Sequence, residues 1–83
     1  MVDRDKEQVW IFTFGYGQQH EGHYVKFFGT YGEARIKMLR EYGTQWGFQY
    51  SEEEWNEYVK EAESFAERVY GSKDFALIEK ELR

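Results

Sequence analysis

The chain of 83 residues contains no cysteine. This absence excludes disulfide bridges, cysteine-ligated zinc and thiol catalysis. Small secreted domains usually carry bridges, so the composition favours an intracellular protein. The chain also lacks an apolar run long enough to span a membrane, and its first residues, MVDRDKE, are charged and unlike a signal peptide. We therefore expect a cytoplasmic protein with no membrane contact.

Basic residues are in the minority. Eleven Lys and Arg residues stand against sixteen Asp and Glu residues, which gives a formal net charge of −5. A protein that binds nucleic acid through a broad face needs cations that displace counterions from the phosphates. The charge balance therefore predicts no direct nucleic-acid binding.

Aromatic residues are abundant instead: three Trp, seven Tyr and seven Phe. Large rings bury much area at little cost in side-chain entropy. This suits a short chain, because folding removes only about 60–65% of its surface from water. The rings exceed what one small core needs, so we expect some of them on a surface that meets a ligand or a partner.

The first part of the chain has the pattern of a β-hairpin. Residues 1–8 are polar and are expected to be a flexible terminus, whereas residues 9–83 are expected to form a single domain. Residues 9–14 and 24–28 are rich in β-branched and aromatic side chains, which is typical of strands. The glycine-rich stretch at residues 15–23 is predicted to be the loop between them.

Two helices are predicted at residues 30–43 and 52–70. Each begins with a Ser or Thr that is followed three residues later by a Glu, which is the pattern of a capping box, and each ends at a glycine. Between the helices, Trp46, Phe48 and Tyr50 alternate with Gln and Gly, which predicts a third strand with one aromatic face.

The C-terminal segment, residues 74–83, is ambiguous between a helix and an edge strand. We favour a helix because Phe75, Ile78 and Leu82 have helical spacing. The predicted fold class is α+β: a small antiparallel sheet of about three strands, in the order ββαβα, with two helices packed on one face. Because residues 9–14 are apolar on both sides, the second face must be covered by another segment, another subunit or a ligand.

The loop at residues 15–23 is the first candidate site. Its glycines allow backbone N–H groups to approach a ligand closely, and its tyrosine, glutamines and histidines offer stacking and polar contacts. We expect it to hold a small nucleotide-like ligand through Phe14, Tyr16, Gly17, Gln18, His20, His23, Lys26 and Arg35. The alternative is a flexible loop whose glycines serve turn geometry, because the spacing completes no phosphate-loop signature.

The two histidines of this loop, His20 and His23, also suit two other kinds of site. Their spacing is that of a metal-binding pair, but the sequence offers no evident third ligand. They could act as general acid and base in nucleotide cleavage, but no nucleophile or partner carboxylate is evident. We therefore predict no metal, no cofactor and no catalytic residue, and keep a small nucleotide hydrolase as the third hypothesis.

The helix predicted at residues 52–70 carries seven glutamates against two basic residues. A rigid row of carboxylates can imitate phosphates and occupy a basic groove on another protein. The second hypothesis is therefore an acidic inhibitor that binds a basic host protein through Glu53, Glu57 and Glu61. The alternative is an ordinary solvated helix face.

A fourth candidate is the outer face of the first hairpin, assigned to Val9, Ile11, Val25 and Phe27. Apolar patches of this kind are usually interfaces, which suggests a homodimer. Coverage by the C-terminal segment is the alternative.

The strings WIFTFGYGQ at residues 10–18 and WGFQYS at residues 46–51, with Gly29-Thr30 between them, resemble short uncharacterised proteins of bacteriophages and mobile elements of Gram-positive bacteria. The resemblance covers about residues 9–55 and implies a setting, the cytoplasm of a host cell, but no mechanism. Small phage proteins are often counter-defence factors. The leading hypothesis is accordingly a non-enzymatic binding protein that sequesters a nucleotide-like immune signal, with the acidic inhibitor as its rival.

Overall fold

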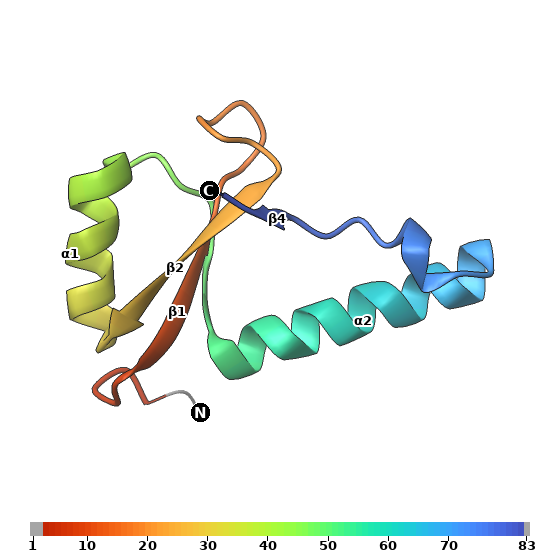
Figure 1. Ribbon diagram of the computed structural model, residues 1–83, viewed down its shortest axis with the longest axis horizontal. Helices are drawn as coiled ribbons and strands as arrows, with labels where there is room; N and C mark the ends of the chain where they lie inside the picture. The colour runs from red at the N-terminus through yellow and green to blue at the C-terminus, as the bar shows by residue number, and fades with distance from the viewer. Residues whose placement is uncertain (1–2, 83) are drawn as a thin grey trace.

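A four-stranded mixed sheet lies at the centre of the computed structural model, which describes residues 3–82 (Figure 1). The α+β class predicted from the sequence is confirmed. In chain order the elements are β1 (Gln8–Thr13), β2 (His23–Gly29), α1 (Tyr31–Tyr42), β3 (Gln49–Ser51), α2 (Glu52–Tyr70), the 3-10 turn η1 (Lys73–Phe75) and β4 (Lys80–Glu81).

The strand order is β3-β1-β2-β4. β1 pairs antiparallel with both β2 and β3, and β4 adds a parallel strand to the outer side of β2. The predicted hairpin and third strand are therefore present, and the sheet gains one short strand. The interior position of β1 follows from its composition, since Ile11 and Phe12 are 1% and 0% exposed although they point to opposite faces.

The two helices lie on opposite faces of the sheet, not on one face as predicted. α1 covers Phe12 and its neighbours with the buried side chains of Ala34 and Met38. α2 covers the other face, where the Trp55 ring packs against Tyr24 with the ring centroids 4.6 Å apart. Figure 1 shows the sheet between them. The second cover that β1 requires is thus another segment of the same chain.

The register of β1 and β2 also corrects the predicted outer face of the hairpin. Phe12 lies opposite Val25, and Ile11 lies opposite Lys26. Val25 and Phe27 therefore belong to the face covered by α1, and they do not share a face with Ile11. The four-residue apolar patch proposed as a dimer surface does not form.

Both predicted capping boxes are present. Thr30 and Ser51 accept hydrogen bonds from the backbone N–H groups of Glu33 and Glu54, and each glutamate accepts one in return from the N–H of the capping residue. The backbone hydrogen bond from Thr30 lowers the pKa of Glu33. Gly71 ends α2 in the left-handed conformation that glycine adopts without strain.

The strand predicted around Trp46, Phe48 and Tyr50 is shorter than expected. Gly47 and Phe48 both form backbone hydrogen bonds to Thr13, the pattern of a β-bulge. The bulge turns Trp46 towards Phe12 on the α1 face, whereas Tyr50 packs against Trp55 on the α2 face. The three rings therefore do not form one aromatic face.

The prediction of a helix at residues 74–83 is wrong for residues 74–82, and Arg83 lies outside the described residues. After the single turn η1, the chain is extended and returns to the sheet, where Lys80 and Leu82 donate backbone hydrogen bonds to the carbonyl oxygens of Gly22 and Tyr24. Leu82 packs against the central cluster. The outer edge of β2 offers unpaired backbone groups, and these bonds satisfy them in a way that a helix would not.

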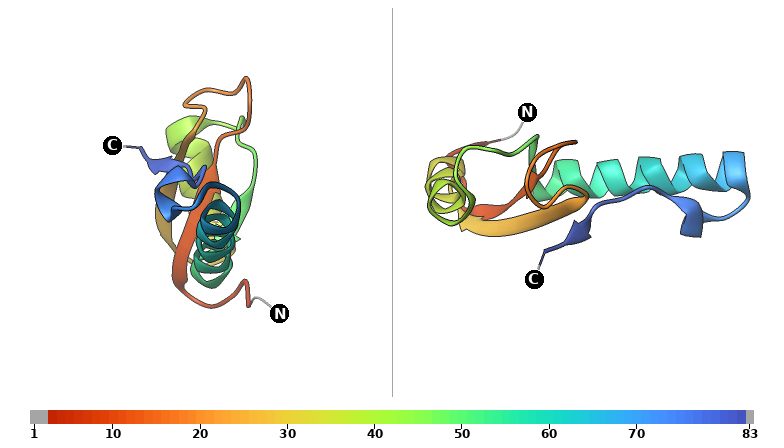
Figure 2. Two further views of the ribbon diagram at one scale, coloured as in Figure 1. Left: turned by 90° about the vertical axis from the view of Figure 1, so that its right-hand side faces the viewer. Right: turned by 90° about the horizontal axis from the view of Figure 1, so that it is seen from above.

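α2 extends well beyond the sheet that covers its first half (Figures 1 and 2). Nineteen helical residues measure about 28 Å, whereas a six-residue strand such as β1 measures about 20 Å. The far half of α2 packs against η1 and the extended segment that follows. We call this projecting part, residues 58–77, the arm. No helix within residues 3–82 is both long and apolar enough to cross a membrane.

Candidate functional site

The loop at residues 15–23 is folded back on itself. The side chain of Gln18 accepts a hydrogen bond from the N–H of Gly15, and the Glu21 carboxylate accepts one from the N–H of Gly17 at 3.2 Å. Gln19 donates to the carbonyl oxygen of Tyr42, which ties the loop to the end of α1. The N–H groups of Gly15 and Gly17, two of the backbone donors that were predicted to approach a ligand, are therefore used within the loop.

His20 occupies a defined position in this loop. Its ring lies edge-on to Phe14 and Tyr42, with ring centroids 5.4 and 5.6 Å away. Its backbone is left-handed, with a φ of 53°, and within residues 3–82 it is the one residue other than glycine with a positive φ. His23 contacts the carbonyl oxygen of Glu21 through Nδ1 at 3.2 Å.

The structure brings only part of the predicted ligand set together. Phe14, Gln18 and His20 lie in one loop cluster, whereas the Tyr16 ring is 96% exposed. Lys26 lies on the face opposite Phe14 and is 3.9 Å from the carboxylate of Glu81.

Arg35 also stands apart from the loop contacts, whereas Gly17 takes part in them through its N–H bond to Glu21. Arg35 lies on the exposed side of α1, two turns before the place where the loop meets that helix. Gly17 has a left-handed φ of 79° at the exposed tip of the loop.

No hydrogen-bonded pair of nucleophile and base involves His20 or His23 in the part of the chain that the structure describes. Within residues 3–82, no group of three or more His, Asp or Glu side chains is placed to hold a metal ion.

Glu53, Glu57 and Glu61 form an exposed row along α2, one on each successive turn. The sequence placed these three carboxylates on one side of a helix, and the structure does so. Among residues 3–82 the ion pair that forms is between Lys26 and Glu81, so the row carries its charge unpaired. It runs from the sheet towards the arm.

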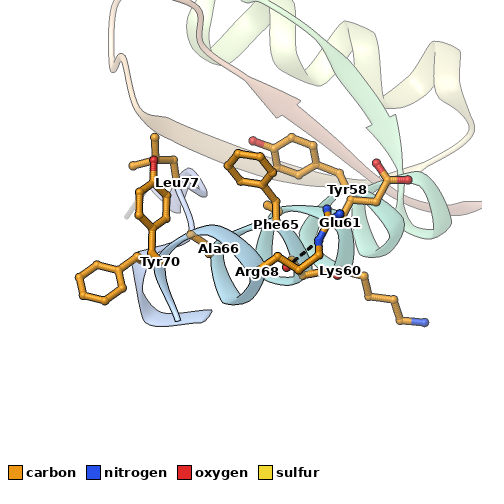
Figure 3. Close-up of a pocket in the computed structure, with 12 residues that line it drawn as sticks. Tyr58, Lys60, Glu61, Phe65, Ala66, Arg68, Tyr70 and Leu77 are labelled. Carbon is orange, nitrogen blue, oxygen red and sulfur yellow. Dashed lines mark hydrogen bonds between the residues drawn. The ribbon is translucent and has the colours of Figure 1, made fainter. Parts of the chain in front are cut away.

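A groove of about 710 Å³ lies on the arm, between the far half of α2 and the segment after η1 (Figure 3). Much of its lining is apolar and open to solvent: Phe65 is 51%, Tyr70 60%, Phe75 62% and Leu77 92% exposed. The other lining residues are Tyr58, Lys60, Glu61, Ala62, Ser64, Ala66, Arg68 and Ala76.

The groove is closed towards the sheet by an aromatic cluster. Tyr58 stacks on Trp55 with centroids 5.2 Å apart and donates a hydrogen bond from its hydroxyl to Oε2 of Glu79 at 3.0 Å. Burial, then this hydrogen bond and the nearby carboxylate, raise the pKa of Tyr58 to about 12. Burial and the charges of Glu79 and Glu54 also raise the pKa of Tyr50. The hydrogen bond to Glu79 ties the extended segment to α2 beside the groove.

The sequence pattern does not reveal the groove, because Phe65 and Val69 recur at the helical spacing that is typical of buried residues. The length of α2 was the one feature of the sequence that could have indicated an exposed surface. A helix of 19 residues overhangs a sheet of short strands, so its last turns require a cover that three strands do not provide.

No family model, curated protein or solved structure is significantly similar to this chain. A function for this chain is therefore inferred from the geometry of the loop, the acidic row and the groove.

Proposed function

We propose that this chain is a non-enzymatic binding protein that engages another protein through the arm. The observation that supports this function best is the groove, in which three aromatic rings and a leucine are exposed to solvent. If a large ring offers about 200 Å² of surface, Phe65, Tyr70 and Phe75 leave about 350 Å² of largely apolar area in contact with water. Contiguous patches of this size on small proteins mark interaction surfaces.

The residue types also suit a protein partner. Interfaces are enriched in Tyr, Phe and Arg, which provide large contact areas with few rotatable bonds. Phe65, Tyr70 and Arg68 supply these on one side of the arm. The helix that carries them is held rigidly at its first turns, by Ser51 and by the packing of Trp55, so little ordering is needed on binding.

The acidic row favours an inhibitory role. Glu53, Glu57 and Glu61 place negative charge beside the groove, which steers a protein with a basic surface towards the arm. Together with the resemblance to short phage proteins, this supports a counter-defence inhibitor that blocks a host protein by surface contact.

Affinity capture from host extract with a matched set of variants tests the proposal. Leu77→Asp places a charge in the groove at a position that is almost fully exposed, and Tyr16→Asp makes the same kind of change on the distant loop. We expect proteins retained by the wild type and by Tyr16→Asp to be lost with Leu77→Asp. Recovery of the same proteins with all three chains would contradict binding through the arm.

A second candidate function, ligand binding at the loop, has one observation in its favour. A left-handed histidine costs about 1–3 kcal/mol and persists where the surroundings hold it, often at functional sites. His20 is held in this way between Phe14 and Tyr42. The sequestration of a nucleotide-like ligand there remains a prediction, and the third hypothesis, a nucleotide hydrolase, gains no support from the hydrogen bonds of His20 and His23.

A further inference from the structure

We propose that the partner bound in the groove is a second copy of this chain, with the two α2 helices packed antiparallel across a two-fold axis at Phe65. The inference rests on the proposed function, that the arm binds protein: the second copy occupies the groove, and the acidic row stays exposed for a host protein. Three features of the arm support it: the placement of its charges, its exposed area and the charge balance of the groove.

The charges beside Phe65 are self-complementary. Glu61 lies four residues before Phe65 and Arg68 lies three residues after it, at distances along the helix of about 6 and 4.5 Å. At 100° per residue, both lie on the same side of the Phe65 ring. A two-fold axis at Phe65 exchanges the two ends of the stripe, so that Glu61 of each copy meets Arg68 of the other.

Both side chains are available for such pairs. Neither Glu61 nor Arg68 forms an ion pair within residues 3–82, although both are exposed. Arg68 donates only from Nε, to the carbonyl oxygen of Ser64 at 3.5 Å, and its terminal nitrogens remain free to bind a carboxylate (Figure 3). Two symmetric ion pairs would then flank the packed Phe65 rings.

The area is sufficient for a small interface. The three exposed rings provide about 350 Å² per copy, hence about 700 Å² in a symmetric pair. Val69 and Leu77, which are 53% and 92% exposed, enlarge the surface towards the roughly 1,000 Å² that a specific interface needs. Dimerisation would thus cover the far half of α2, which extends beyond the sheet.

The charges divide the arm into two surfaces: the lining of the groove suits a second copy, whereas the acidic row, which extends outside it, suits a basic partner. The charged residues of the groove are Lys60, Glu61 and Arg68, so the groove itself is not acidic. The acidic row extends from Glu61 towards the sheet, away from the proposed axis. In an antiparallel pair the two acidic ends lie far apart, which limits the repulsion between two chains that each carry a charge of −5.

Charge reversal provides a sharp test, with dimerisation measured by sedimentation velocity over a concentration series. We expect the wild type to dimerise, and Glu61→Arg and Arg68→Glu each to weaken the dimer at least about tenfold, because each change brings like charges together twice. The double variant Glu61→Arg/Arg68→Glu should restore dimerisation, since it reverses both members of each pair. Circular dichroism of each variant checks that α2 remains folded.

The outcomes separate this inference from the proposed function. A dimer that the double variant does not restore would overturn the axis at Phe65. A wild-type monomer at all concentrations would overturn the second copy as partner, and the proposed function would stand if Leu77→Asp still abolished capture of a host protein. A monomer with capture unaffected by Leu77→Asp would overturn both.

Discussion

The two faces of the sheet are covered to different extents. On the α1 side, Ala34 and Met38 are fully buried against Phe12, and the helix matches the strands in length. On the α2 side, Trp55 closes the part next to the sheet, but Phe65 and Leu77 beyond it remain open. Both helices are amphipathic and both begin with a capping box. The difference in burial therefore arises from how much of each helix the sheet covers. An apolar stripe becomes core only where an opposing surface covers it.

The largest expected effect comes from truncating a ring on each side. Phe12→Ala removes a fully buried ring and should lower the free energy of unfolding by about 3–5 kcal/mol. Phe65→Ala removes a ring of the same size that is half exposed, and in the monomer should cost about 1 kcal/mol or less. Urea denaturation of both variants at low protein concentration measures the contrast. Equal losses would mean that the arm is part of the core.

The loop at residues 15–23 lies at the end of the α1 side, where Gln19 ties it to Tyr42. If the loop holds a nucleotide, a cyclic dinucleotide or ADP-ribose derivative at about a hundred times its Kd should add about 2.7 kcal/mol of stability and raise the Tm. His20→Ala should abolish the shift, because His20 is packed between Phe14 and Tyr42 at the centre of the loop. Thermal unfolding with a panel of such ligands is the measurement, and no shift with any of them argues against this use of the loop.

The capping boxes of α1 and α2 allow the two sides of the sheet to be compared at the level of single hydrogen bonds. Ser51 is buried and its box is partly shielded from water, whereas the box of Thr30 is exposed. Ser51→Ala should therefore cost about 1–2 kcal/mol and Thr30→Ala about 0.5–1 kcal/mol, since water can replace only the exposed bond. Equal losses in chemical denaturation would remove the distinction.

High pH should lower the stability of the fold through the aromatic cluster on the α2 side. The folded state raises the pKa of Tyr58 from 10.0 to about 12, so it holds the phenolic proton more tightly than the unfolded chain does. The stability that this group contributes is complete below pH 10 and is lost as the pH rises from 10 to 12. Tyr58→Phe should reduce this pH dependence, and the part that remains should come from Tyr50, whose pKa is also raised. Unfolding in urea across this pH range checks the prediction, which fails if the variant keeps the slope of the wild type.

Much of the fold followed from short-range patterns. The capping boxes at Thr30 and Ser51, the glycine at position 71 and the apolar residues of β1 are local signals, because each reflects the conformation of a few neighbouring residues. The errors concerned relations between distant segments. The side of the sheet that α2 covers, the register that places Val25 beside Phe12, and the bulge at Gly47 all depend on the packing of residues far apart in the chain.

The candidate sites divide in the same way. The acidic row could be read from spacing alone, because Glu53, Glu57 and Glu61 recur with the period of the helix. The predicted ligand set could not, since it joined to the loop Lys26, which pairs with Glu81, and Arg35, which lies two turns before the contact of the loop with α1. The C-terminal segment was misassigned because Phe75, Ile78 and Leu82 fit a helix locally, whereas the backbone bonds from Lys80 and Leu82 to β2 require an extended chain.

By itself the sequence determined the two helices, the first hairpin and the need of β1 for cover on both faces, because hydrophobic period and capping chemistry act over one or two turns. Only the tertiary structure decided how much of α2 is covered by the sheet. A sheet of short strands reaches the first turns of a 19-residue helix and no further. The apolar stripe beyond that point, with Phe65 at its centre, is therefore left as a surface for a partner.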